Sequence, residues 1–141
     1  KLDLEWVASM AEQFDDVIYE EQAADFTEHQ QRRLTDPGFE RWLRTNVVDH
    51  RVPGYNGVYL SLKPMNVPPG DLTADQFRAV ADLMDEFNQG YCASVYNQNL
   101  FFQYIRNADL GPLYDALLPL GLATRPTQIR RPQRGLPKNS V

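Results

Sequence analysis

A helix with capping signals at both ends constrains the fold of this chain more than any other part of its sequence. Thr73-Ala74-Asp75-Gln76 has the form of a capping box, in which the Thr73 hydroxyl accepts from the Gln76 N–H and the Gln76 side chain reaches back. Asn88-Gln89-Gly90 ends the helix, because glycine and, less readily, asparagine adopt the left-handed conformation. We expect one face of this helix to be buried, formed by Phe77, Val80, Ala81, Met84 and Phe87.

Strand-forming residues lie on both sides of the helix. Val58–Leu62 precedes it and Tyr91–Val95 follows it. A strand, a helix and a strand in this order favour a βαβ crossover over one face of a sheet. Leu100–Ile105 predicts a third strand after the polar turn Tyr96-Asn97-Gln98-Asn99.

The order of these elements predicts the fold class. A second helix, capped by Asn107 or Asp109 and ended by Gly121, gives the order βαββα, and a final strand from the tail would complete a ferredoxin-like βαββαβ sandwich. The apolar face of this helix carries Leu110, Leu113, Leu117 and Leu120. We therefore predict an α+β, ferredoxin-like sandwich at residues 36–124, with a helical extension or connector at 1–35 and an extended basic tail at 125–141.

The first part of the chain is predicted to be mainly helical. Apolar residues recur at helical spacing between Trp6 and Ile18, whereas residues 20–33 are polar and would fray or pack on something absent. We expect His29, in the polar run, to be solvated. Thr35-Asp36-Pro37-Gly38 predicts a turn, followed by a short amphipathic helix over residues 39–43.

Charge is distributed unevenly along the chain. The net charge is −5, yet residues 125–141 hold 5 of the 14 basic side chains and none of the 19 acidic ones. A basic tail without interleaved aromatic residues favours packing on the acidic body over binding to nucleic acid. No apolar run approaches the roughly 18–20 residues that cross a bilayer, and no signal peptide is recognised. We expect a cytoplasmic protein with no nucleic-acid or membrane partner.

Few residues offer catalytic chemistry. Cys92, the single cysteine, cannot form an internal disulfide or alone hold zinc or an iron–sulfur cluster, and we expect it to be buried on a central strand. No phosphate loop, histidine pair at helical spacing or Ser-His-Asp arrangement is present. The polar turn at residues 96–99, near Lys63 on the neighbouring strand, could present hydrogen-bond donors to a ligand; a solvated hairpin turn is the alternative.

Several motifs between residues 36 and 124 keep a consistent order and spacing. They are Phe39-x-x-Trp42-x-x-x-Asn46-Val47, His50-x-x-Pro53-Gly54-Tyr55, Val58-x-Leu60-Ser61-Leu62-Lys63-Pro64, Pro68-Pro69-Gly70-Asp71-x-Thr73-Ala74-x-Gln76, Gln98-Asn99-Leu100 and Gly121-Leu122-Ala123-Thr124. Together they resemble the siroheme-dependent nitrite and sulfite reductases, and more narrowly the ferredoxin-like half domain of their haemoprotein component. The Pro-Gly-Tyr and Ser-Leu-Lys-Pro pieces resemble the second half domain more than the first.

The resemblance implies a larger oxidoreductase. Such an enzyme holds siroheme, a haem-type cofactor, and a 4Fe-4S cluster linked by a shared cysteine thiolate. It reduces sulfite to sulfide, or nitrite to ammonia, with electrons from a donor protein. This chain would line the cofactor and substrate pocket together with the remaining halves of the parent reductase. Alone it would be inactive, with no catalytic residue or metal ligand and neither cofactor held.

The resemblance also implies which residues line that pocket. They are Lys63, Asn97, Gln98, Asn99 and Lys138. Asn97 stands where the family's first half domain carries an arginine directed at siroheme carboxylates or the bound anion, so a neutral donor replaces a charged one. Lys138-Asn139-Ser140-Val141 resembles the piece that leads to the first cluster cysteine.

A free-standing ferredoxin-like module that binds a small anion or a partner protein through its basic tail is the alternative function. Cysteines soon after Val141 in the parent reading frame would support the reductase, and a stop codon there would support the free-standing module. The pattern does not separate sulfite from nitrite, because the selecting residues would lie outside this stretch.

Overall fold

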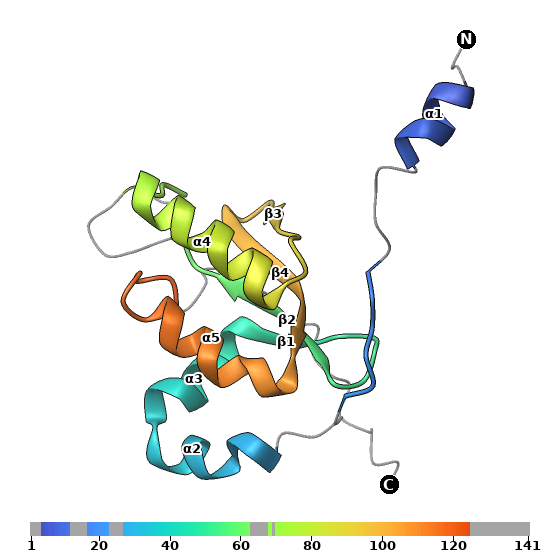
Figure 1. Cartoon of the computed structure of the whole chain (residues 1–141). Helices are drawn as coiled ribbons and strands as arrows, with labels where there is room; N and C mark the ends of the chain where they lie inside the picture. The colour runs from blue at the N-terminus through green and yellow to red at the C-terminus, as the bar shows by residue number, and fades with distance from the viewer. Residues whose placement is uncertain (1–3, 12–16, 23–26, 63–67, 69, 125–141) are drawn as a thin grey trace, which may run out of the picture.

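A four-stranded antiparallel sheet forms the centre of the fold (Figure 1). The structure is a computed structural model that describes residues 4–11, 17–22, 27–62, 68 and 70–124. The spatial order of the strands is β1-β2-β4-β3. Their bounds are Val47–Asp49 for β1, Tyr55–Leu60 for β2, Ala93–Val95 for β3 and Asn99–Arg106 for β4.

Helices α3, α4 and α5 pack on one face of this sheet (Figure 1). Their bounds are Pro37–Asn46, Ala74–Phe87 and Leu110–Leu117. Shorter elements are α1 (Leu4–Ala11), the 3₁₀ turn η1 (Thr27–His29), α2 (Gln30–Thr35) and the 3₁₀ turn η2 (Asn107–Asp109). Helices on one face of an antiparallel sheet make an α+β fold, and the predicted ferredoxin-like class is confirmed.

The strand topology confirms the predicted order βαββα. Both β2 and β3 pair antiparallel with β4, so they run parallel to each other with β4 between them and α4 as their connection. On its other side, β2 pairs antiparallel with β1. The tail, residues 125–141, lies outside the described residues. The sequence analysis assigned no strand at residues 47–49, because three residues are too few to show an alternating pattern.

The buried face of α4 differs from the prediction at Phe77 and Leu83. Val80 and Leu83 are buried and Met84 and Phe87 are partly buried, whereas Phe77 is 64% exposed. Leu83 and Phe77 are each three residues from Val80 and lie on opposite sides of it around the helix, so the buried face is turned toward the side of Leu83. The apolar face of α5 is confirmed for Leu110, Leu113 and Leu117, which are fully buried. The helix ends at Leu117, so Leu120 lies beyond it and is partly buried, and the side chain of Asp109 makes no capping hydrogen bond.

The prediction that His29 is solvated is wrong. His29 is 6% exposed, and its Nε2 lies 2.6 Å from the carbonyl oxygen of Asn107. Its ring packs against Phe39, with centroids 5.5 Å apart. Nearby, Arg32 makes two hydrogen bonds to Asp115, of 2.9 and 2.5 Å. The polar run around η1 and α2 therefore packs on the start and outer face of α5 rather than fraying.

Two further expectations for the first part of the chain need correction. Residues 17–22 contain neither helix nor strand, although this region was predicted to be mainly helical. Within α1, Trp6 is 59% exposed, so the described part of the predicted apolar stripe is not covered. The predicted turn at Thr35–Gly38 is a junction between helices, where the Asp36 carboxylate accepts from the Phe39 N–H at 3.0 Å and Pro37 begins α3.

The capping box of α4 is present as the sequence indicates. The Thr73 N–H donates to Gln76 Oε1 at 2.9 Å, and the Gln76 N–H donates to Thr73 Oγ1 at 3.2 Å. Gln76 also donates through Nε2 to the Leu120 carbonyl at 2.8 Å, so the cap joins the start of α4 to the segment after α5.

We predict that Thr73→Ala lowers the free energy of unfolding by about 1 kcal/mol, because it removes the acceptor for a helix-terminal N–H. Urea titration of both proteins measures the difference. Arg78→Ala is the control in the same helix: its ion pair with Asp75 is exposed, so a change below about 0.5 kcal/mol is expected. Equal losses in the two variants would contradict a specific role for the cap.

Candidate functional site

The end of β2 and the β3–β4 hairpin turn lie at the same end of the sheet. Leu60 pairs with Leu100, and Val95 pairs with Asn99 at the start of β4. The structure therefore brings the predicted site residues Asn97, Gln98 and Asn99 beside the end of β2. Lys63 and Lys138 lie outside the described residues.

The hairpin turn has a tight and defined geometry. The Gln98 N–H donates to the Val95 carbonyl at 2.9 Å, and Gln98 adopts a φ of 60°. A three-residue loop closed by a residue in the left-handed region is a common hairpin form. Tyr96 and Gln98 are exposed, Asn97 is half-buried and Asn99 is 1% exposed. The turn thus presents side chains both outward and toward the sheet end.

Among the residues that the structure describes, five buried side-chain polar atoms have no hydrogen-bond partner, and three of them lie at this end: Ser61 Oγ, Asn97 Oδ1 and Asn99 Nδ2. The other two, Trp42 Nε1 and Gln103 Oε1, belong to α3 and to the middle of β4. Asn99 uses its other side-chain atom, Oδ1, to accept from the Leu62 N–H at 3.4 Å. Because leaving a buried polar group unpaired costs about 1–3 kcal/mol, such a group of atoms marks a place that is short of partners. Sequence reasoning missed Ser61; its one signal is a hydroxyl between two leucines in an apolar strand.

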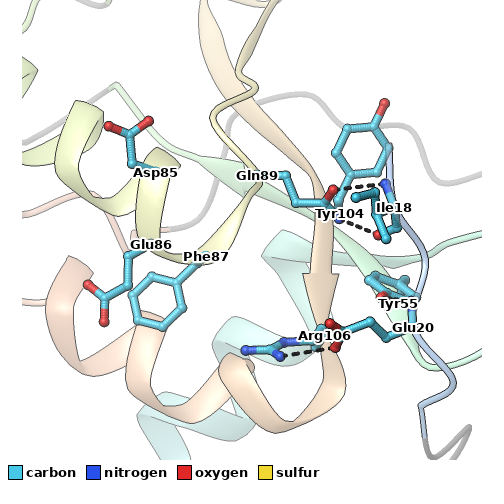
Figure 2. Close-up of a pocket in the computed structure, with 9 residues that line it drawn as sticks. All are labelled: Ile18, Glu20, Tyr55, Asp85, Glu86, Phe87, Gln89, Tyr104 and Arg106. Atoms are coloured by element: carbon cyan, nitrogen blue, oxygen red, sulfur yellow. Dashed lines mark hydrogen bonds and ion pairs between the residues drawn. The ribbon is translucent and has the colours of Figure 1, made fainter. Parts of the chain in front are cut away.

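A separate pocket of about 310 Å³ lies where the C-terminal end of α4 approaches β4 and residues 17–22 (Figure 2). Its lining consists of Ile18, Glu20, Tyr55, Asp85, Glu86, Phe87, Gln89, Tyr104 and Arg106. Arg106 is the basic residue of this lining, and it donates to Asp109 at 2.5 Å and lies 3.6 Å from Glu20. The hydrogen bond to Asp109, with the nearby carboxylates, raises the pKa of Arg106. Arg106 is therefore already engaged by Asp109 and Glu20, so a free anion would have to displace Glu20 to reach it.

The sequence analysis placed Cys92 on a central strand, and the structure shows that this is wrong. Cys92 precedes β3, which forms an edge of the sheet, and it is half-buried against the core. Burial raises the pKa of its thiol, and a backbone hydrogen bond at Phe101 partly offsets that effect. The thiolate is the reactive form, so this environment suppresses reactivity. Among the described residues, no cluster of three or more histidine, cysteine or acidic side chains could hold a metal ion.

Comparison with known protein families gives a match that includes this end of the sheet. Residues 60–120 match the family described as the nitrite/sulfite reductase ferredoxin-like half domain. This part of the chain is thus similar to that half domain. The matched range runs from the last residue of β2 to just beyond α5, so it contains α4, β3, the hairpin turn, β4 and α5 but leaves out most of β2. No curated protein matches the chain.

Two further points concern the half domain as part of a larger protein. A half domain implies that the parent reductase contains other domains. None of the helices that the structure describes is long and apolar enough to cross a membrane.

We predict that a thiol reagent labels Cys92 more slowly in the native chain than in the denatured chain. The pH at which labelling is half-maximal should also be higher in the native state, because the pKa of the buried thiol is raised. As pH rises through the ordinary thiol range, the unfolded chain loses this proton first, so Cys92 lowers the stability of the fold there and has no such effect at lower pH. Native labelling as fast as denatured labelling would refute the assignment. Cys92→Ala, which has no thiol, gives the background level of labelling.

Proposed function

We propose that this chain lines the cofactor and substrate pocket of a siroheme- and 4Fe-4S-dependent sulfite or nitrite reductase, and that the sheet end at residues 96–99 faces that pocket. The family match of residues 60–120 supports the parent enzyme class. The observation that carries the proposal is the group of unpartnered polar atoms on Ser61, Asn97 and Asn99 at one end of the sheet. Such atoms are suited to contacts with a polar ligand or with an adjoining domain.

The donor set of the chain fits one of the two cofactors. Siroheme carries carboxylates, which are hydrogen-bond acceptors, and the hydroxyl of Ser61 and the amide of Asn99 are donors without acceptors. A 4Fe-4S cluster requires several thiolates, and the chain has only Cys92. We therefore assign the cluster to other domains of the parent, and only polar contacts with siroheme to this half domain.

Each predicted pocket residue has a physical role under this proposal. Lys63 follows the end of β2 and would add positive potential for a substrate oxyanion or a siroheme carboxylate. Asn97 would supply a neutral hydrogen bond where the first half domain of the family has an arginine. Gln98 and Asn99 would position the backbone or water. Lys138 would contribute charge from the tail. Siroheme and the cluster supply the electron transfer, and this chain would bind and orient.

The proposal also assigns the three parts of the chain. Residues 1–35 would be a connector from the preceding half of the parent, residues 36–124 the half domain, and residues 125–141 the link toward the cluster-binding part. An electron-donor protein would contact the assembled enzyme.

We predict that Lys63→Met in the intact parent lowers turnover of sulfite or nitrite by roughly tenfold or more, since tenfold corresponds to about 1.4 kcal/mol of lost transition-state stabilisation. The melting temperature should be nearly unchanged. Arg51→Met is the matched control, because it removes one positive charge before β2, at the opposite end of that strand. Unchanged kinetics in Lys63→Met would mean that the family supplies the fold here without the site.

We predict that residues 1–141 purified alone bind neither siroheme nor iron. One cysteine cannot assemble a cluster, and the siroheme pocket would need both halves of the parent. Absorption spectroscopy and iron analysis after gel filtration check this prediction. A visible band that persists with stoichiometric iron would contradict it.

A further inference from the structure

Residues 17–22, here called the strap, lie along the end of α4 and the strands β2 and β4 without forming helix or strand themselves (Figure 2). The side-chain amide of Gln89 bonds to both backbone groups of Ile18: its Oε1 accepts from the Ile18 N–H at 3.0 Å, and its Nε2 donates to the Ile18 carbonyl at 2.8 Å. A neighbouring strand would pair with an extended peptide through the same two groups. Gln89 therefore binds the strap by its backbone, whatever side chain stands at residue 18.

Gln89 has a backbone conformation that glycine would adopt at lower cost. Its φ is 52°, in the left-handed region, and it follows directly after the end of α4 at Asn88. Residues other than glycine are uncommon in this region, and backbone strain of this kind is concentrated at functional sites. In this structure the Gln89 side chain makes the pair of hydrogen bonds to the Ile18 backbone.

The next residues of the strap are recognised by their side chains. The Tyr19 ring lies against three rings, with centroids 5.6 Å from His50, 5.2 Å from Tyr55 and 6.1 Å from Tyr104. The His50 ring is held in place because its Nδ1 accepts from the Val52 N–H at 2.9 Å. This set of rings selects an aromatic side chain.

Glu20, the residue after Tyr19, is contacted through both its backbone and its carboxylate. The Glu20 N–H donates to the Tyr55 hydroxyl at 2.8 Å, and the Glu20 carboxylate lies 3.6 Å from the Arg106 guanidinium. Along the strap, the contacts thus recognise an extended backbone at residue 18, an aromatic side chain at residue 19 and an acidic side chain at residue 20. Together these are the features of a peptide-binding groove rather than of continuous core packing.

Much of the strap is exposed to solvent and contributes little to the apolar core. Ile18 is 73% exposed, and Glu20 and Glu21 are exposed as well. Segments with few buried apolar contacts open at low free-energy cost while the core stays folded. Ile18 and Glu20 also form one side of the 310 Å³ pocket, so release of the strap would uncover the pocket together with the faces of Tyr55 and Tyr104.

We propose that His50, Tyr55, Gln89, Tyr104 and Arg106 form a groove for an extended peptide in which an aromatic residue precedes an acidic one. Residues 17–22 occupy this groove in cis as a removable strap. This inference does not depend on the reductase function, because it concerns the opposite end of β2 from the hairpin turn.

Hydrogen exchange of the full chain tests the strap. Gln89→Gly removes the amide and relieves the left-handed strain, so the Ile18 and Glu20 amides should exchange at least about tenfold faster while β2 and β4 keep their protection. Tyr19→Ala should have the same effect. Glu21→Ala is the matched control, since this exposed residue of the same segment should leave exchange unchanged. Unchanged exchange in Gln89→Gly would overturn the proposal.

Binding in trans tests the groove. A labelled peptide with the sequence of residues 15–24 should bind the Tyr19→Ala chain at least about tenfold more tightly than the wild-type chain, whose own strap competes. The same peptide with its tyrosine changed to alanine should not bind. Equal binding to both chains, or no binding to a chain whose strap exchanges fast, would overturn the groove. If Tyr19→Ala fails to fold, Glu20→Pro replaces it, because proline removes the N–H donated to Tyr55. Wild-type chains that exchange straps would elute as dimers, which also supports the groove.

Discussion

The antiparallel pairing of β2 with β4 is the interaction on which the other elements depend. This pairing buries Val58 opposite Phe102 at the centre of the core. The outer edge of β2 pairs with β1, and the outer edge of β4 pairs with β3. Because β4 separates β2 from β3, α4 must cross over the sheet to connect them. Gly57 makes this pairing possible on the other face, since a Cβ there would overlap the ring of Phe101. A larger residue at 57 would displace that ring or separate the strands.

Buried asparagines connect this sheet to its surroundings. Asn46, at the end of α3, donates to the carbonyls of Tyr59 and Thr124, both at 2.9 Å. Asn56 donates to Asn107 Oδ1 at 2.7 Å, and Asn88 accepts from the Tyr104 N–H at 2.6 Å. At these places the polar groups of loops and strands satisfy each other. The contrast with the hairpin end, where Ser61, Asn97 and Asn99 each keep an unpartnered atom, is what gives that end its functional interest.

The two candidate binding regions differ in how far sequence could find them. The hairpin turn and the end of β2 were predicted as neighbours, because the order βαββ alone brings strand ends together. Ser61 was missed, since a single hydroxyl in an apolar run carries no pattern. The groove around Tyr19 was missed entirely: its rings come from residue 19 and from residues 50, 55 and 104, and no local period connects them. His29 was misassigned for the same reason, because its partner Asn107 is 78 residues away.

The sequence by itself determined the elements whose signals are local. The capping box at Thr73, the stop at Asn88–Gly90 and the leucine face of α5 each rest on residues within a few positions of one another, so spacing was enough. Only the tertiary structure decided which strand flanks β2, that Cys92 lies at an edge, and that Leu83 rather than Phe77 is buried. These outcomes depend on which surfaces meet across the sheet, and burial against a distant partner outweighs the small free-energy differences that local patterns reflect.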